Sequence, residues 1–383
     1  MTKWTIPISV CDVLIFFGIC TGVMFATLLF FSRRIHRIAN RCLGLAVLIL
    51  VCWLIWVVGI DINLYRYMPF WSWIPLQYSL TLGPLIWLYV QLLTSQRPIF
   101  HRKYWWHLSP FLLEQGVFAG ELFQSYHHNT PTYYTQIFWR FNPLLQVLAL
   151  ISVLSYLTLS RRTLNRYSRR LVQQFSDADR YEFRWLKRLL FVFGLIWLLW
   201  IPYFFVDYFF FDYNLPISAY YPLHLLLAGA ACWIGVEAFL RPEFIVTEIS
   251  IKDQSIPNER AAVTEELQQQ SAWLRAQVEE NLLYRNAGLT LRELADLLAM
   301  HPNELSYLIN AGTGKNFNDF INSYRVNDVV RRIKDPAYHH ITLLGIAYDC
   351  GFNSKTTFNR TFIQMIGISA TDYRKKSKTA PKL

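Results

Sequence analysis

Hydrogen-bonding side chains recur at helical spacing in residues 354–362, near the end of the 383-residue chain. Phe358 and Phe362 lie four residues apart, so they would bury one side of a helix and leave the other side to polar residues. That polar side consists of Lys355, Thr356, Asn359 and Arg360. Basic and amide side chains form hydrogen bonds to base edges and phosphates in the DNA major groove. The spacing therefore predicts a helix that contacts DNA.

A shorter helix must hold this DNA-contacting helix in place, and residues 341–350 are expected to form it. Its inward face would consist of Leu343, Leu344, Ala347 and Tyr348. Gly351 ends this helix, because glycine adopts a positive φ without steric strain. Ser354 then caps the next helix. A short helix, a tight turn and a second helix with a basic outer face are typical of a helix-turn-helix unit.

Residues 290–310 predict a second unit of the same kind. Thr290 and Glu293 have the spacing of a capping box, and Pro302 suits the first position of a helix. The outward side of the helix that begins there carries Asn303, Ser306 and Tyr307. A longer helix at residues 317–334 would join the two units. Their recognition helices are then expected to enter successive major grooves, about 34 Å apart.

The sequence before residue 240 is typical of a membrane protein. The whole chain is 54% hydrophobic and only 16% charged, whereas soluble domains carry about 25% charged residues. Charged residues are sparse up to about residue 240 and reach an ordinary density after it. Seven apolar runs approach the roughly 20 residues that cross a bilayer, at residues 9–31, 42–60, 70–93, 107–124, 142–160, 189–211 and 217–239.

The basic residues of the loops predict the orientation of these runs. Lys and Arg are concentrated after the first, third and fifth runs and are sparse in the alternate loops. Because cytoplasmic loops carry the excess of basic residues, the N-terminus is expected outside and the C-terminal half in the cytoplasm. The loop at residues 161–188 is basic enough to be expected on anionic lipid headgroups.

Polar groups inside the apolar runs are costly in a bilayer and are therefore candidates for function. Glu114 lies within the fourth run and is the candidate residue for sensing a signal. The alternative for Glu114 is a satisfied hydrogen bond between helices. Polar residues nearer the ends of the runs, to which the same alternatives apply, are Gln77, Asp207, His224 and Glu237.

No residue pattern in the sequence indicates an enzyme, a cofactor or a metal site. There is no Ser/His, paired-Asp or HExxH constellation of the kind that hydrolases use. His127 and His128 are adjacent, but no third ligand follows at a useful spacing. The six cysteines form no CxxC or Cys/His pattern, so they are expected to be buried small apolar residues.

The expected fold is all-α and has four parts. Residues 1–241 form a seven-span transmembrane sensor domain, residues 242–271 a partly helical cytoplasmic linker, residues 272–376 a double helix-turn-helix domain, and residues 377–383 a basic tail. Apolar residues recur at helical spacing in residues 260–284. This helix is either a homodimer contact or the first helix of the soluble domain.

Residues 272–376 resemble the DNA-binding domain of the AraC/XylS family of transcriptional regulators. The matching positions are Leu291-Arg-Glu-Leu-Ala295, Gly314-x-x-Phe317-x-x-Phe320-Ile321, Arg325, Ile346-Ala347, Gly351-Phe352, Phe358-x-Arg360-x-x-Phe362, Gly367-x-Ser369 and Tyr373-Arg374. Two features depart from the family pattern. Ala370 replaces the usual proline after Ser369, and the first recognition helix is less basic than is common.

The resemblance implies that base contacts come from the outward faces of both recognition helices. It assigns DNA contact to Asn303, Ser306, Tyr307, Lys355, Thr356, Asn359 and Arg360. A second set, expected to contact phosphate or to form salt bridges inside the domain, consists of Arg325, Arg331, Arg332, Lys375 and Lys376. Together with the apolar half, the chain resembles membrane-embedded AraC-type regulators of bacteria.

We therefore expect a multi-pass protein of the bacterial inner membrane that senses a signal through its transmembrane half and binds promoter DNA in the cytoplasm. The expected partners are double-stranded DNA, the lipid bilayer, an unidentified signal ligand, RNA polymerase and a second copy of the chain. The alternative is a transporter or channel with a regulatory DNA-binding tail. Transport would favour internal repeats, and the sequence shows no clear repeat.

Overall fold

The computed structural model describes residues 8–32, 36–95, 102–132, 135–178, 183–212, 215–240 and 265–379. The described secondary structure is helical apart from one isolated β-bridge, which confirms the predicted all-α class. The chain divides into two compact units, which are Met1–Asn165 with Phe183–Ile245 and Arg166–Glu182 with Val246–Leu383. Several predictions fall outside the described residues: residues 242–264 of the linker, residues 380–383 of the tail, and the basic Arg33, Arg34 and Arg97.

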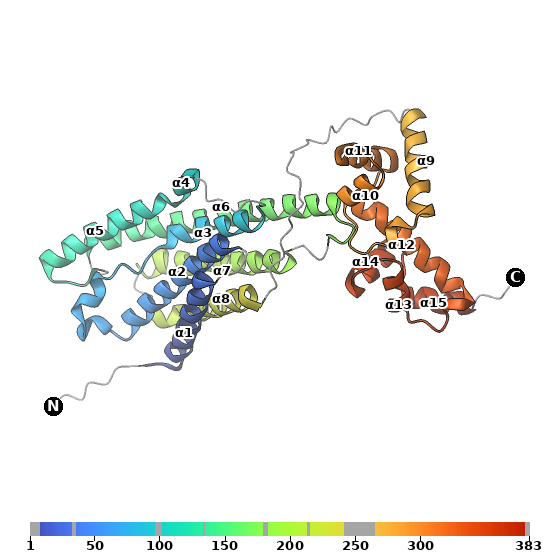
Figure 1. Ribbon diagram of the computed structural model, residues 1–383. Helices are drawn as coiled ribbons and strands as arrows, with labels where there is room; N and C mark the ends of the chain where they lie inside the picture. The colour runs from blue at the N-terminus through green and yellow to red at the C-terminus, as the bar shows by residue number, and fades with distance from the viewer. Residues whose placement is uncertain are drawn as a thin grey trace. The chain divides into compact units, whose positions relative to one another are not determined.

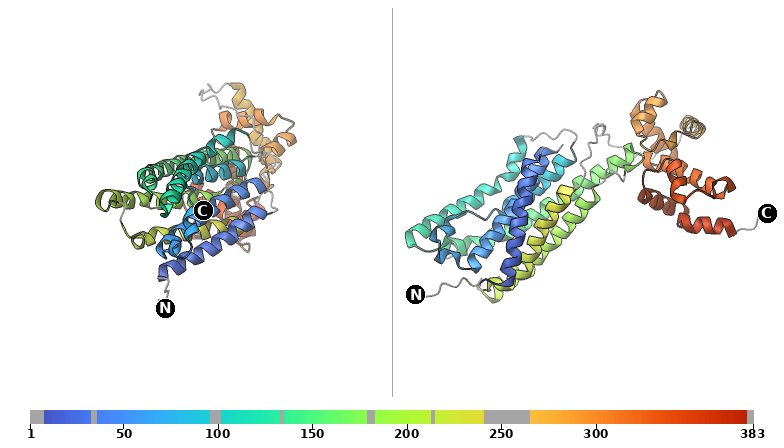
Figure 2. Two further views of the ribbon diagram at one scale, coloured as in Figure 1. Left: turned by 90° about the vertical axis from the view of Figure 1, so that its left-hand side faces the viewer. Right: turned by 60° about the horizontal axis from the view of Figure 1, so that its bottom comes forward.

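The first unit is a bundle of long helices that run side by side in Figures 1 and 2. Its α-helices are α1 (Val10–Phe31), α2 (Arg37–Asp61), α3 (Ser79–Leu93), α4 (Trp105–Leu108), α5 (Pro110–His128), the first part of α6 (Gln136–Gln174), α7 (Arg184–Phe210) and α8 (Tyr221–Leu240). Short 3₁₀ helices lie at Leu64–Arg66, Pro69–Trp73, Arg102–Tyr104 and Ile217–Tyr220.

The core of this bundle is formed by apolar residues of α1, α2, α3, α7 and α8, with further residues from α6. Helix α1 packs between α2 and α8. Gly18 permits the close approach of α1 to α8, because a Cβ atom there would lie 2.6 Å from Cβ of Ala228. Small residues at such crossings are typical of helix packing in membranes.

The outward faces of the bundle are apolar. Among the exposed large side chains are Phe17 at 67%, Leu112 at 70% and Phe191 at 61%. In water such a surface would be an association or aggregation site, whereas in lipid it is the solvated surface. Within the described residues, five helices are long and apolar enough to cross a membrane, namely α1, α2, α6, α7 and the helical segment Ile217–Phe239.

Two of the seven predicted runs differ from simple spans. In the run at residues 70–93, the α-helix covers only Ser79–Leu93 and has 15 residues. The preceding Pro69–Trp73 forms a 3₁₀ helix instead. The fourth run coincides with α5, which has 19 residues but is not among the helices long and apolar enough to span. Its buried carboxylates, Glu114 and Glu121, lower its hydropathy.

The second unit consists of short helices around two adjacent cores. Its α-helices are the end of α6, α9 (Glu265–Glu280), α10 (Leu291–Leu297), α11 (Pro302–Thr313), α12 (Phe317–Lys334), α13 (Leu343–Asp349), α14 (Lys355–Ile366) and α15 (Ala370–Thr379). Short 3₁₀ helices lie at Leu283–Arg285 and Pro336–Tyr338. Figure 1 draws α9 to α15 in orange and red and the end of α6 in green.

Helix α12 joins the two cores of this unit. Its first half places Phe317, Phe320 and Ile321 in a core with α9, α10 and α11. Its second half places Val326 and Val329 in a core with α13, α14 and α15. The predicted linker helix is therefore present. Helix α9 buries Leu267, Leu274 and Val278 in the first of these cores, so it packs as a helix of the second unit.

Candidate DNA-binding surface and the contacts that position it

The first helix-turn-helix unit consists of α10 and α11. The predicted capping box is present, since Glu293 N donates to Thr290 Oγ1 over 3.1 Å and Thr290 N donates to the Glu293 carboxylate over 2.9 Å. His301 caps α11 through Nδ1, which accepts from Asn303 N. Buried Leu305, Leu308 and Ile309 fix the inner face of α11. Its outward residues are the half-buried Asn303 and Ser306 and the exposed Tyr307.

The second unit consists of α13 and α14. Gly351 has φ +94°, and Ser354 Oγ accepts from Thr357 N over 3.1 Å, which caps α14 as the sequence predicts. Phe358 and Phe362 are buried on one side of α14. All four predicted DNA-contacting residues of this helix are exposed on the other side: Lys355, Thr356, Asn359 and Arg360.

Arg325 occupies a different environment from the other predicted DNA contacts. Its side chain is completely buried. Nε donates to the Tyr284 carbonyl over 2.8 Å, and Nη2 donates to the Asn286 carbonyl over 2.8 Å and to Ser176 Oγ over 3.0 Å. Nη1 donates to Asn322 Oδ1 over 3.2 Å. Of the two roles predicted for Arg325, these contacts contradict the contact with DNA phosphate, because its donors are used inside the domain.

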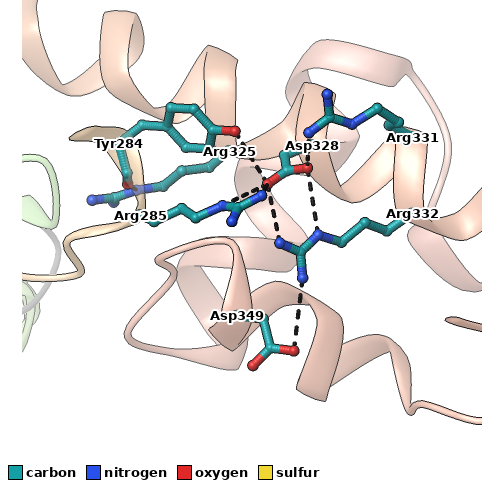
Figure 3. Close-up of polar contacts among 7 residues, drawn as sticks. All are labelled: Tyr284, Arg285, Arg325, Asp328, Arg331, Arg332 and Asp349. Carbon is teal, nitrogen blue, oxygen red and sulfur yellow. Dashed lines mark hydrogen bonds and ion pairs between the residues drawn. The ribbon is translucent and has the colours of Figure 1, made fainter. Parts of the chain in front are cut away.

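A buried carboxylate organises the basic residues around the second half of α12 (Figure 3). Asp328 accepts from Arg285 at 2.9 Å, from Arg331 at 2.7 Å, from Arg332 at 3.4 Å and from the Tyr284 hydroxyl at 3.2 Å. Burial raises the pKa of Asp328, but these arginines outweigh burial and hold the pKa below its ordinary value. Arg331 and Arg332 therefore form salt bridges within the domain, one of the two roles predicted for them.

The segment that follows α6 is buried in the second unit. Residues 175–178 are all buried, and Phe175 forms an antiparallel bridge with Thr290. Asn318 Nδ2 donates to the Ser176 carbonyl over 2.8 Å, and Asn322 Nδ2 donates to the same carbonyl over 3.1 Å. These backbone contacts place the segment against both α12 and the start of the first helix-turn-helix unit.

The side chains of this segment reach the second helix-turn-helix unit as well. Asp177 Oδ1 accepts from Thr357 Oγ1 over 3.2 Å. Thr357 is a buried residue of α14, the helix that carries the predicted DNA-contacting residues of the second unit. Burial lowers the pKa of Arg325 to about 10, while the charge of Asp177 opposes that shift. We had expected residues 161–188 to lie on lipid headgroups, and for residues 175–178 that prediction was wrong.

Glu114 forms hydrogen bonds between helices, which was the alternative to a sensing role. Its Oε1 accepts from both the backbone N and the hydroxyl of Ser79 over 2.8 Å, and its Oε2 accepts from Leu80 N over 3.3 Å. These groups lie at the start of α3, where backbone N–H groups have no partner within the helix. Glu114 is therefore a buried cap of α3 that ties it to α5.

Two helix-turn-helix units that share a linker helix define an AraC-type helix-turn-helix domain, a class of domain that binds DNA. A family model described as a helix-turn-helix domain matches residues 294–376. The HTH-type transcriptional regulator Rv1931c of Mycobacterium tuberculosis (strain ATCC 25618 / H37Rv) is 31% identical over 83 residues, which are 22% of this chain and 31% of that protein. The chain thus covers about a third of that relative's length. No solved structure matches it.

Sequence reasoning missed Ser176 and Asp177 as residues of the DNA-binding unit. More than 140 positions separate them from their partners on α12 and α14. A local signal did exist for their partners, since Asn318, Asn322 and Arg325 interrupt the apolar face of α12 at spacings of four and three residues. Polar residues that share the buried face of a helix require partners, and these partners came from the end of α6.

Proposed function

We propose that the chain is a membrane-embedded, sequence-specific DNA-binding regulator of transcription. The observation that supports this most directly is the exposed polar face of α14, formed by Lys355, Thr356, Asn359 and Arg360. The opposite side of the helix is aromatic and buried. The outward residues of α11, Asn303, Ser306 and Tyr307, supply the second reading face. The AraC-type architecture of residues 294–376 supports the same conclusion.

In this proposal the first unit is a seven-span bundle with its N-terminus outside. The five helices that satisfy the length and apolarity of a span are supplemented by α3 and α5. An odd number of crossings delivers the DNA-binding unit to the cytoplasm, where the promoter is. A reporter enzyme fused after residue 250 should therefore be active in its cytoplasmic form. Activity of a periplasmic reporter at that position would contradict this topology.

Helix α6 provides the connection through which a signal reaches the DNA-binding unit. It is continuous from Gln136 to Gln174, and its residues from Arg166 onward belong to the second unit. The segment after it holds Thr357 of α14 through Asp177. A shift or rotation of α6 would therefore change the position or stability of a recognition helix. Regulation requires that the signal bind two states of the first unit with unequal affinity.

The test of DNA recognition uses the full-length protein in lipid nanodiscs and a random double-stranded DNA library. Repeated selection should enrich one motif, and genome-wide occupancy in the source cell should find that motif upstream of regulated genes. Arg360→Ala is expected to weaken binding by about 1–3 kcal/mol and to relax the base preference at one position. Lys355→Ala should weaken binding and reduce the salt dependence if it contacts phosphate.

Arg275→Ala is the matched control, because Arg275 is an exposed arginine on α9 that belongs to neither reading face and donates only to the Gly312 carbonyl at the C-terminal end of α11 among its described hydrogen bonds. It should leave the motif and the affinity for it unchanged. If no motif is enriched from the library, or if Arg360→Ala and Arg275→Ala bind the motif equally well, the proposed reading surface is wrong.

A further inference from the structure

A cavity of about 290 Å³ lies in the first unit, at one end of its bundle. It is lined by the C-terminal end of α2, the N-terminal end of α6, the C-terminal end of α7 and the start of α8. In the proposed topology all four of these ends face the outside of the cell. The volume is close to the lower limit of small-molecule sites in proteins.

Five of the thirteen described residues that line the cavity carry Trp, Phe or Tyr rings. Trp56, Phe138, Trp139, Trp200 and Tyr220 all line the cavity. The rings of Trp200 and Tyr220 are 5.9 Å apart at an interplanar angle of 38°, so they form two neighbouring walls. Aromatic faces attract organic cations, and the attraction increases where water is excluded.

A buried carboxylate lies beside these rings. Asp207 is 7% exposed, and it accepts from Leu215 N over 3.0 Å and from the Tyr220 hydroxyl over 2.6 Å. Both of these donors are uncharged, and no lysine or arginine is among the described residues that line the cavity. A buried carboxylate is normally paired with a positive charge, and a bound ligand can supply it here.

A second polar side chain borders the same space. His224 lines the cavity and is 4% exposed. Its Nδ1 is buried and has no hydrogen-bond partner among the described residues. The rings of His224 and Tyr220 are stacked at 6.1 Å, which places the imidazole beside the hydroxyl that Asp207 binds. A buried polar atom without a partner is unfavourable, so a ligand group that pairs with it gains affinity.

We propose that this cavity is a binding site for a small protonated amine that carries an aromatic or apolar group. The ammonium group lies between the Asp207 carboxylate and His224, and donates N–H hydrogen bonds to both. The apolar part of the ligand lies against Trp56, Trp139 and Trp200. The two acceptors favour an ammonium with N–H groups over a quaternary ammonium, which has none. The inference rests on the proposed function, for which it supplies the class of signal.

The cavity is also placed where a ligand can act on α6. Phe138, Trp139, Asn142 and Gln146 of this helix line it, and Asn142 and Gln146 are joined by a 2.6 Å hydrogen bond. Pro143 lies between them within the helix, and an internal proline removes one backbone hydrogen bond and makes bending easier. A ligand at this site therefore contacts the helix whose other end lies in the DNA-binding unit.

Three probes that share a phenethyl group test the site on the full-length protein in nanodiscs. They are 2-phenylethylamine, the uncharged 2-phenylethanol, and the quaternary phenethyltrimethylammonium ion, each titrated by calorimetry. We expect the amine to bind at least about tenfold more tightly than the alcohol, because only the amine forms a charge-assisted hydrogen bond with Asp207. The quaternary ion should bind more weakly than the amine.

Variants assign the interaction to individual residues. Asp207→Asn keeps the size of the side chain and should lower the affinity for the amine at least about tenfold, with little effect on the alcohol. His224→Leu should lower the affinity for the amine several-fold. Glu237→Gln, at the other end of α8 from His224, is the matched control and should leave the affinity unchanged. Retained binding of 2-phenylethanol shows that a variant has folded.

The proposal is overturned if the amine does not bind at millimolar concentration, if the alcohol binds as well as the amine, or if Asp207→Asn and Glu237→Gln behave alike. DNA affinity is measured separately, with and without the amine. Amine binding that leaves the DNA affinity unchanged supports this site but contradicts the sensing role in the proposed function. DNA binding without any amine binding supports the proposed DNA-binding function and contradicts only the proposed amine site.

Discussion

At the scale of single residues, the placement of Arg325 shows that a basic side chain in a DNA-binding domain need not touch DNA. Its side chain donates four hydrogen bonds within the unit, to two carbonyl oxygens, one amide oxygen and one hydroxyl. A fixed fork of N–H donors suits this role, and lysine could not replace it. The contacts join α12 to the start of the first unit and to the segment after α6.

The first prediction concerns Arg325→Ala. It should destabilise the second unit by about 2–4 kcal/mol, because several buried oxygens lose their donors. Hydrogen exchange of the α12 amides in the full-length protein measures this loss. The salt dependence of DNA binding by the folded protein should stay unchanged. An unchanged exchange rate with a reduced salt slope would show instead that Arg325 contacts phosphate.

The second prediction concerns the pH dependence that Asp328 gives to stability. Its pKa in the folded protein is lower than its ordinary value of 3.8. The carboxylate therefore stabilises the fold at pH values above about 4, and this contribution is lost as the pH falls through the folded pKa. Asp328→Asn should cost about 3 kcal/mol at pH 7, since it removes the buried charge to which Arg285, Arg331 and the largely buried Arg332 donate.

The difference between wild type and Asp328→Asn should shrink below pH 4, where the wild-type carboxyl becomes protonated. Hydrogen exchange of the α12 amides, at several pH values and corrected for the intrinsic rates, provides the measurement. Asp349→Asn is the control, because Asp349 is 57% exposed and 3.8 Å from Arg332. It should change stability by less than about 0.5 kcal/mol. A difference for Asp328→Asn that is constant with pH would contradict the assigned role.

At the scale of elements, the third prediction compares two glycines that end helices of the second unit. Gly351 has φ +94°, and a Cβ atom there would lie 2.6 Å from the Tyr284 carbonyl and 2.8 Å from the Arg285 carbonyl. Gly367 has φ +83° but open space around its Cβ position. Gly351→Ala should cost at least about 3 kcal/mol, and Gly367→Ala only about 1–2 kcal/mol. Equal losses in hydrogen exchange of α14 would show that the backbone contacts of Gly351 do not matter.

Local rules predicted the elements of the second unit well. The caps at Thr290 and Ser354, the start at Pro302 and the end at Gly351 follow from interactions within a few residues of one another, which the sequence displays directly. The outer faces of α11 and α14 follow from helical periodicity. In the first unit, the length of the apolar stretch overstated the third run, because Pro69–Trp73 is largely aromatic but forms a 3₁₀ helix.

Contacts between distant segments could not be predicted in this way. The site at Asp207 and His224 needs four helix ends, and the segment at residues 175–178 needs partners on α12 and α14. A sequence read alone shows that Asp207 and His224 are costly inside an apolar run, but it does not show that they share one cavity. Tertiary packing supplies that information, because it brings together residues that no periodic pattern relates.

At the scale of the whole molecule, the proposed function assigns signal transmission to α6, because this helix belongs to both units. Its end is held in the second unit by amide side chains of α12 that donate to the Ser176 carbonyl. If these bonds transmit the state of the first unit, their loss should separate sensing from DNA binding. The recognition residues themselves do not take part in these bonds.

The fourth prediction is that Asn318→Ala with Asn322→Ala uncouples the two units. The double variant should bind its DNA motif within about threefold of wild type, while the signal no longer changes that affinity, because coupling free energies of about 1–3 kcal/mol depend on such contacts. Hydrogen exchange of residues 171–178 should increase in the same protein. Asn353→Ala is the matched control. The Asn353 side-chain amide donates a 2.6 Å hydrogen bond to the Ala287 carbonyl, which is not part of the segment after α6. A double variant that still responds to the signal as Asn353→Ala does would exclude this segment as the route of coupling.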